Sequence, residues 1–157
     1  RKLARKYKAN GDAVAEFSTR LFDQTQDILH DMGALEREYL WAAAMLHNSG
    51  HYVSHSAHHK HSYYLIRNGG LLGFSAAEVE IISNIARYHR KSFPKRRHEN
   101  YSGLPKYARK LIDQLSAILR LAVALDRARA QAISSIETRF DPQSRLLTIC
   151  LIPADEN

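Results

Sequence analysis

The segment LEREYLWAAAMLHNSGH, residues 35–51, predicts one buried helix and the point at which it ends. Apolar side chains recur at helical spacing from residue 35 to residue 46, and the last turns are nearly all apolar, which is typical of a helix with neighbours on every side. Asn-Ser-Gly at 48–50 breaks helices. We therefore expect His47 to lie at the end of a central helix and His51 to lie in the loop that follows.

Helical patterns continue on both sides of this segment. Residues 12–31 form an amphipathic pattern, which Gly33 would end as a left-handed cap. Residues 57–68 form another, which ends at a Gly-Gly pair. The glycines at 69, 70 and 73 superficially suggest a dinucleotide-binding loop, but no strand precedes them, so the pattern fails the structural condition for that site.

Two further helices follow. Ser75 and Glu78 form a capping box, so a helix begins there. Its apolar face includes His89, and Pro94 would end it. The longest pattern covers about 105–131, with leucine and isoleucine at core spacing.

The pattern changes after the last helix. Residues 133–140 and 146–152 read as two strands joined by a turn at 141–144. A two-stranded hairpin is marginal in water, so we expect it either to belong to an incomplete sheet or to pack on the helices. The fold class is mainly α, a bundle of about five to seven helices over 1–131, followed by the hairpin over 132–157.

Composition narrows the class of protein. The chain has 157 residues, of which 45% are apolar and 25% charged, as in soluble globular proteins. No apolar run is long enough to span a bilayer, so we expect no membrane partner. Cys150 is the single cysteine, which excludes an internal disulfide and fits a reducing, cytoplasmic compartment. The first residue is Arg1, so we expect a piece of a longer protein.

The positive charge is concentrated in one segment. The net charge is +7, yet residues 87–110 alone hold nine Lys or Arg and a single acid, Glu99. Such a field attracts polyanions: nucleic acid, acidic lipid or a phosphate chain. The alternative is a solvated basic face without a ligand. Six of the nine histidines fall between His47 and His61, and histidine both ligates metals and, when protonated, donates to phosphate.

Four motifs, taken in order, carry a family resemblance. They are LHNSGH at 46–51, HHKHSYYLI at 58–66, ARYHRK at 86–91 and ILRLAVALDR at 118–127. Together they resemble the C-terminal, HD-like domain of the exopolyphosphatase/guanosine pentaphosphate phosphatase (Ppx/GppA) family.

The resemblance implies an HD-domain-like helical bundle that helps to bind polyphosphate and to form a homodimer. It also implies two N-terminal actin-like domains, absent from this chain, that carry the phosphohydrolase site and its Mg²⁺. We expect no catalytic residue and no cofactor in this chain. Its expected partners are inorganic polyphosphate or another phosphate polyanion, and the actin-like domains of the same polypeptide.

The positions of an HD metal site are degenerate here. An active site has a His-Asp doublet and a further helical Asp, because carboxylates hold hard cations. Here the doublet reads His47-Asn48, and Val123 stands where the further Asp is expected. An amide is a poorer ligand than a carboxylate and valine is none. We therefore predict no metal at the relic positions, which include His51.

Candidate ligands for phosphate follow from the resemblance and from the adjacent basic segment, since arginine can chelate phosphate oxygens in a fork. The predicted phosphate-binding residues are His58, His59, His61, Arg87, His89, Arg90 and Lys91, with an outer basic rim of Lys95, Arg96 and Arg97.

Two other functions stay open. Single-stranded nucleic acid could stack on the aromatic side chains of the basic segment, which are Tyr88, Phe93, Tyr101 and Tyr107. An independent HD-type metal phosphohydrolase is the third possibility, and the metal content of the purified protein would distinguish it.

Overall fold

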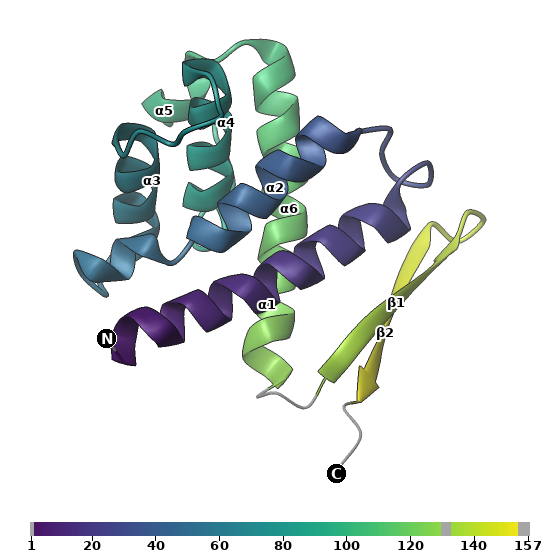
Figure 1. The fold of residues 1–157 in the computed structure, drawn as a ribbon. Helices are drawn as coiled ribbons and strands as arrows, with labels where there is room; N and C mark the ends of the chain where they lie inside the picture. The colour runs from purple at the N-terminus through teal and green to yellow at the C-terminus, as the bar shows by residue number, and fades with distance from the viewer. Residues whose placement is uncertain (1, 130–132, 154–157) are drawn as a thin grey trace.

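The computed structural model describes residues 2–129 and 133–153, with side chains from residue 11 to 127 and from 133 to 153. In this part of the chain it contains six α-helices, one 3-10 helix and an antiparallel hairpin (Figure 1). They are α1 (Lys2–Thr25), α2 (Ala34–Leu46), η1 (Ser49–Tyr52), α3 (His58–Asn68), α4 (Ala76–Arg87), α5 (Glu99–Ser102), α6 (Lys106–Arg129), β1 (Ile133–Asp141) and β2 (Leu146–Pro153). The mainly helical class with a C-terminal hairpin is confirmed. The predicted boundary at 131/132 lies outside the described residues.

Helices α2 and α6 form the centre of the bundle. In Figure 1, α6 runs behind both α1 and α2, and α3 and α4 stand side by side at the end where η1 lies. The core contains the apolar faces that helical spacing predicts, with Leu40 of α2, Ile82 of α4 and Leu119 of α6 fully buried. The apolar helix expected over 35–46 is thus central, as predicted, but it does not have neighbours on every side, since Leu35 and Trp41 are about half exposed.

The helix predicted over 12–31 is wrong at both ends, since α1 already begins at Lys2. Helix α1 ends at Thr25, not near residue 31, because the chain turns at Asp27, which has a left-handed backbone with φ 61°. Gly33 is not a left-handed cap. Its φ is −106°, and it stands at the start of α2, where its backbone N–H donates to Oε2 of Glu36 at 2.9 Å.

Helix α4 also ends earlier than expected, at Arg87, and not at Pro94. The chain leaves the helix through Tyr88 and reaches a left-handed residue, Lys91, with φ 61°. Arg120 of α6 donates to the backbone oxygens of Tyr88 and Lys91, each at 3.1 Å. This turn therefore ends the helix through a contact with a distant element, which no local pattern could indicate.

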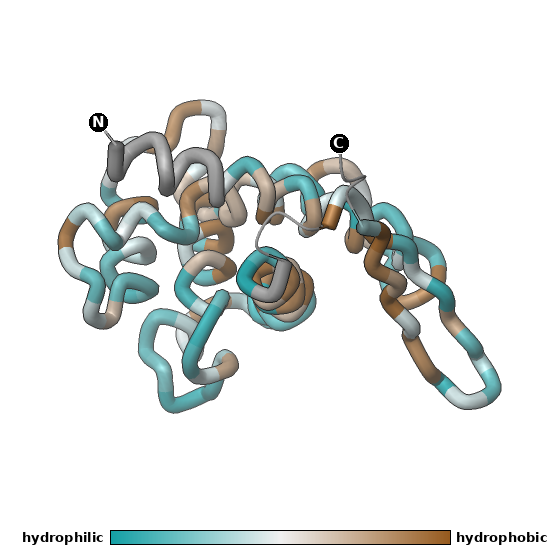
Figure 2. The backbone as a smooth tube through the Cα atoms, turned by 90° about the horizontal axis from the view of Figure 1, so that it is seen from below, coloured by the Kyte–Doolittle hydropathy of each residue, from teal (hydrophilic) through white to brown (hydrophobic). Residues whose placement is uncertain are grey.

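The hairpin packs on the outside of α1. Ile136 of β1 is 1% exposed, and Nε2 of Gln24 donates to its backbone oxygen at 2.9 Å. Figure 2 shows the hairpin projecting from the helices, with apolar positions along both strands. Leu146 is 59% exposed and Leu151 46%. Of the two alternatives, packing on the helices is observed, and β1 and β2 form a two-stranded sheet in the described residues.

No helix within residues 2–129 is both long and apolar enough to cross a membrane.

Candidate anion-binding site

Four cationic side chains line one open pocket of about 570 Å³ between the turn after α4 and the outer face of α6. The described residues that line it include no acid. They are His89, Arg90, Lys91, Arg120, Val123, Ala124 and Arg127. We call this set the cationic pocket. A pocket lined by cations and by no carboxylate favours an anion with several charges.

The turn after α4 carries two of these cations, Arg90 and Lys91. Lys91 owes its position to the left-handed backbone there. Arg120 braces the turn by its two backbone hydrogen bonds, and its guanidinium carbon lies 4.2 Å from the centre of the Phe93 ring. Arginine stacks well on aromatic faces. Arg120 therefore both lines the pocket and holds the backbone of its other wall.

Sequence reasoning did not place Arg120 and Arg127 in the site. They lie seven residues apart on α6, which is about two helical turns, with Val123 between them on the same face. That spacing was visible in the sequence. What the sequence did not show is that this face of α6 meets the turn after α4.

Behind the pocket lies a cluster of imidazoles from α2, η1, α3 and the end of α4. Nε2 of His58 lies 3.2 Å from Nε2 of His89. The ring of His47 meets that of His89 edge-on at 4.9 Å between centres, and the ring of His51 stacks on His58 at 3.7 Å. His47 and His89 each have Nδ1 at 2.6 Å from the backbone oxygen three residues earlier.

Burial keeps this cluster uncharged at neutral pH. Removal from water lowers the pKa of His47, His58 and His59 to about 4. His51 and Arg90 act in the same direction on His58, as do Arg87 and Arg90 on His59. The pKa of His89 is lowered well below its ordinary value, again mainly by burial. At pH 7 the charge of the site therefore comes from Arg and Lys.

The other predicted ligands are spread more widely. Nδ1 of His59 is buried and has no hydrogen-bond partner among the described residues. His61 is half-buried on α3 and makes no hydrogen bond or ring contact with the cluster in the same part of the chain. Arg87 lies over the ring of Tyr63, 5.3 Å from its centre, and does not line the cationic pocket.

The outer rim is exposed and does not line the cationic pocket either. Lys95, Arg96 and Arg97 follow Pro94 in the loop before α5. Arg96 lines a different pocket, of about 700 Å³, together with Lys106, Lys110 and their neighbours at the start of α6. The basic segment therefore serves two separate surfaces.

The relic HD positions are divided between the cluster, which contains His47 and His51, and the pocket, which Val123 lines. Val123 lines the pocket and is 7% exposed, His47 is buried, and His51 and Asn48 are half-buried. Within residues 2–129 and 133–153, no three His, Cys, Asp or Glu are arranged to hold a metal ion. That no metal binds at these positions stays a prediction, which the metal content of the purified protein would test.

The aromatic side chains of the basic segment offer little surface for stacked bases. Tyr88 is 3% exposed and Tyr101 7%. Phe93 is exposed, but the guanidinium of Arg120 lies over its ring. Tyr107 is exposed, yet it lines the other basic pocket. Consecutive bases need a row of free ring faces, so the structure does not favour the nucleic-acid alternative.

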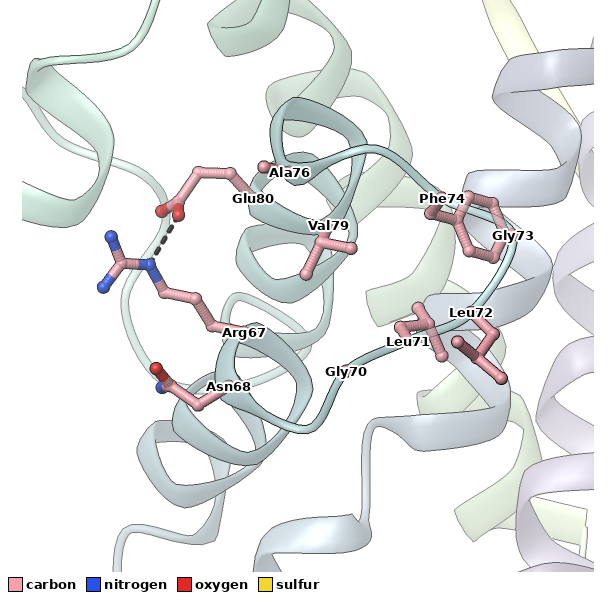
Figure 3. A pocket seen from close by; sticks show the side chains of 10 residues that line it. All are labelled: Arg67, Asn68, Gly70, Leu71, Leu72, Gly73, Phe74, Ala76, Val79 and Glu80. Atoms are coloured by element: carbon pink, nitrogen blue, oxygen red, sulfur yellow. Dashed lines mark hydrogen bonds and ion pairs between the residues drawn. The ribbon is translucent and has the colours of Figure 1, made fainter.

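A further hollow lies at the loop between α3 and α4 (Figure 3). Arg67 of α3 reaches across to Glu80 of α4 and donates to its carboxylate at 2.6 Å. The rest of the wall is largely apolar, including Leu71 and Phe74. Since its one cation is paired, this hollow is not a second polyanion site. A helix precedes the glycines of this loop, as the argument against a dinucleotide site expected.

Comparison with known proteins identifies the family to which this chain is similar. Residues 1–155 match the model of the Ppx/GppA phosphatase, domain III. A curated relative, the guanosine-5'-triphosphate,3'-diphosphate pyrophosphatase of Pseudoalteromonas atlantica, is 29% identical over 119 residues. These residues are 75% of this chain and 23% of the relative. The chain thus spans about a quarter of the length of that protein.

Proposed function

This chain belongs to the Ppx/GppA phosphatase family, of which it is domain III, and we propose on that basis that its cationic pocket is an accessory binding site for a phosphate polyanion. The polyanion is inorganic polyphosphate or guanosine pentaphosphate, and its terminal phosphate is released by actin-like domains outside this chain. The Mg²⁺ of those domains and a homodimeric assembly belong to the same proposal and rest on the family resemblance.

The single observation that carries the proposal is the convergence of Arg90, Lys91, Arg120 and Arg127 on one open pocket. Guanidinium groups form forked hydrogen bonds with phosphate oxygens, and lysine adds a compact charge. No described residue of the lining carries a negative charge that would neutralise them. A chain of phosphates offers oxygens at a regular spacing and can therefore occupy several of these groups at once.

The proposal is tested by replacing Lys91 and Arg127, whose side chains make no hydrogen bond among the described residues. We choose Lys91→Asn/Arg127→Gln, because asparagine tolerates the left-handed backbone at position 91. Loss of two charged contacts should weaken binding of long-chain polyphosphate about tenfold or more. The slope of log K against log salt should become shallower by about 1.4, since about 0.7 counterions are released per contact on a single chain.

The matched control is Lys110→Gln/Arg139→Gln, which removes one lysine and one arginine that are exposed and do not line the pocket. It should leave the slope nearly unchanged. Because Lys110 lines the other basic pocket, the pair also compares the two surfaces. Equal losses in both double variants, or no loss in the first, would show that polyphosphate does not bind in the cationic pocket.

A further inference from the structure

The hydrogen bonds around His89 determine where its proton lies. Nδ1 of His89 is 2.6 Å from the backbone oxygen of Ala86, and two acceptors do not approach so closely, so this nitrogen carries a proton. The residue is 3% exposed, and a neutral ring has only one N–H. Nε2 of His89 therefore presents a lone pair, and it faces Nε2 of His58 at 3.2 Å.

The same reasoning extends to His58. To satisfy the lone pair of His89, Nε2 of His58 must donate, which leaves Nδ1 of the neutral His58 ring as an acceptor. Nη1 of Arg90 lies 3.0 Å from that Nδ1 and 3.4 Å from Nε2 of the same ring, so Nδ1 is the nearer acceptor. A guanidinium can only donate, so the three contacts form one directed chain from Arg90 through His58 and His89 to Ala86.

One alternative arrangement is available, and it is less favourable. The backbone oxygen of His55 lies 3.3 Å from Nδ1 of His58 and could accept a proton from it. Nε2 of His58 would then accept, from Nη1 of Arg90 at 3.4 Å. The lone pairs of the two Nε2 atoms would face each other at 3.2 Å, or His89 would carry protons on both nitrogens and become a buried imidazolium beside a guanidinium.

The groups that face the two rings come from every neighbouring element. They are His47 on α2, His51 on η1, His59 on α3, Arg90 after α4, and, around His47, Asp126 and Arg127 on α6. Asp126 raises the pKa of His47, whereas the strongest influences on His58 and His89 are burial, the neighbouring imidazoles and, for His58, Arg90. The neutral pair thus has mainly cations and neutral rings around it.

We propose that His58 and His89 are positioning residues: as a neutral, proton-ordered pair they hold the guanidinium of Arg90 at the cationic pocket. Although His89 lines that pocket, both of its ring nitrogens are engaged, so it offers the polyanion no free N–H. This inference rests on the proposed function for its biological meaning, but the hydrogen-bond chain can be tested without any ligand. It also replaces the sequence-based assignment of His58 and His89 as direct phosphate ligands, which their exposures of 2% and 3% do not favour.

The first test is the proton position in the unmodified protein at neutral pH, read from long-range ¹H–¹⁵N NMR correlations of the imidazole rings. We expect the Nδ1–H form for His89 and the Nε2–H form for His58. Protons on both nitrogens of His89, or the Nδ1–H form of His58, would overturn the inference, whatever the protein binds.

The second test compares His58→Gln with His58→Leu in binding of long-chain polyphosphate. A glutamine amide can accept from Arg90 and donate to His89, whereas leucine can do neither. We expect leucine to weaken binding about tenfold, the size of one well-placed charge-assisted hydrogen bond, and glutamine to stay within about threefold of the unmodified protein. Equal losses of polyphosphate binding in the two variants, or no loss in His58→Leu, would contradict a positioning role.

The two proposals fail separately. If Lys91→Asn/Arg127→Gln leaves polyphosphate binding unchanged, the cationic pocket is not the binding site, while the NMR result for the histidine pair still stands. If His58→Leu does not fold, the NMR measurement on the unmodified protein decides the matter by itself.

Discussion

Gly50 is the residue whose lack of a side chain lets η1 approach α3. A methyl group built on it would lie 2.0 Å from the backbone oxygen of His58 and 2.5 Å from the backbone nitrogen of Ser62. Its own N–H donates to Oγ of Ser62 at 2.9 Å, and that hydroxyl donates to the backbone oxygen of His47 at 2.6 Å. The close approach at Gly50 therefore keeps His51 stacked on His58.

We predict that Gly50→Ala destabilises the protein by about 3 kcal/mol, because backbone atoms must move to make room for the new methyl group. The control is Gly103→Ala, where nothing lies within 4 Å and the backbone is right-handed. That change should be neutral or stabilise by up to about 1 kcal/mol. Urea unfolding of both variants measures the difference, and similar free energies for the two would refute the packing argument.

At the scale of elements, the hairpin is the most weakly attached part. Ile136 is its one fully buried side chain among the described residues, and it is joined to α1 by hydrogen bonds from Gln24 to its backbone and from Thr138 to the backbone of Gln24 at 3.4 Å. Arg20 of α1 also bonds to Ser135. One buried side chain and a few polar contacts therefore connect two strands to the helices.

We predict that Ile136→Ala releases the hairpin while the helices stay folded. The loss of about 2–5 kcal/mol on truncating a buried isoleucine exceeds what an isolated hairpin can supply. Hydrogen exchange followed by mass spectrometry should show faster exchange in β1 and β2 and unchanged exchange in α2 and α4. Leu146→Ala, at a largely exposed position, should change neither. Faster exchange throughout would mean that hairpin and helices unfold together.

At the scale of the whole molecule, the buried histidines couple folding to pH. The pKa of His47 is lowered from 6.5 to about 4, first of all by burial. The unfolded chain therefore binds the proton more tightly than the folded protein does. This contribution to stability is fully present above pH 6.5 and is lost as the pH falls toward 4. For His47 alone it amounts to about 3 kcal/mol.

We predict that the free energy of unfolding falls by several kcal/mol between about pH 7.5 and about pH 5, since His58, His59 and His89 are shifted in the same direction. Urea unfolding at a series of pH values gives the number of protons taken up on unfolding. His47→Asn should lower that number near pH 5 by about one. A free energy that stays level over this range would show that the cluster is not buried as described.

Polyphosphate binding in the cationic pocket would also shift the protonation equilibrium of the buried histidines. A polyanion in the cationic pocket stabilises nearby positive charge, so it opposes the effect of Arg90 on the imidazoles behind it. The whole domain then has two linked features, a cationic surface that faces solvent and an uncharged polar interior that supports it. The cations and imidazoles involved come from four segments of the chain, 47–51, 58–59, 89–91 and 120–127.

Much of the fold could be predicted from local pattern. The apolar run before His47 indicates a central helix, and Ser75 and Glu78 form the capping box as expected, with the N–H of Ser75 donating to Glu78 at 2.7 Å. The strands lie within a residue of their predicted bounds. The ends of α1 and α4 could not be predicted, because a turn at Asp27 and the bracing of Tyr88 by Arg120 determine them.

Periodicity, capping and motif order are properties of neighbouring residues, so the helices, the basic segment and the family could be read from the sequence. Packing sets which cations meet: Arg120 and Arg127 join Arg90 and Lys91, while Arg87 turns to Tyr63. It also decides that the imidazoles are neutral, since burial is set by the packing of four separate elements. A side chain's charge and partners depend on what surrounds it in space, and helical spacing specifies only which face it occupies.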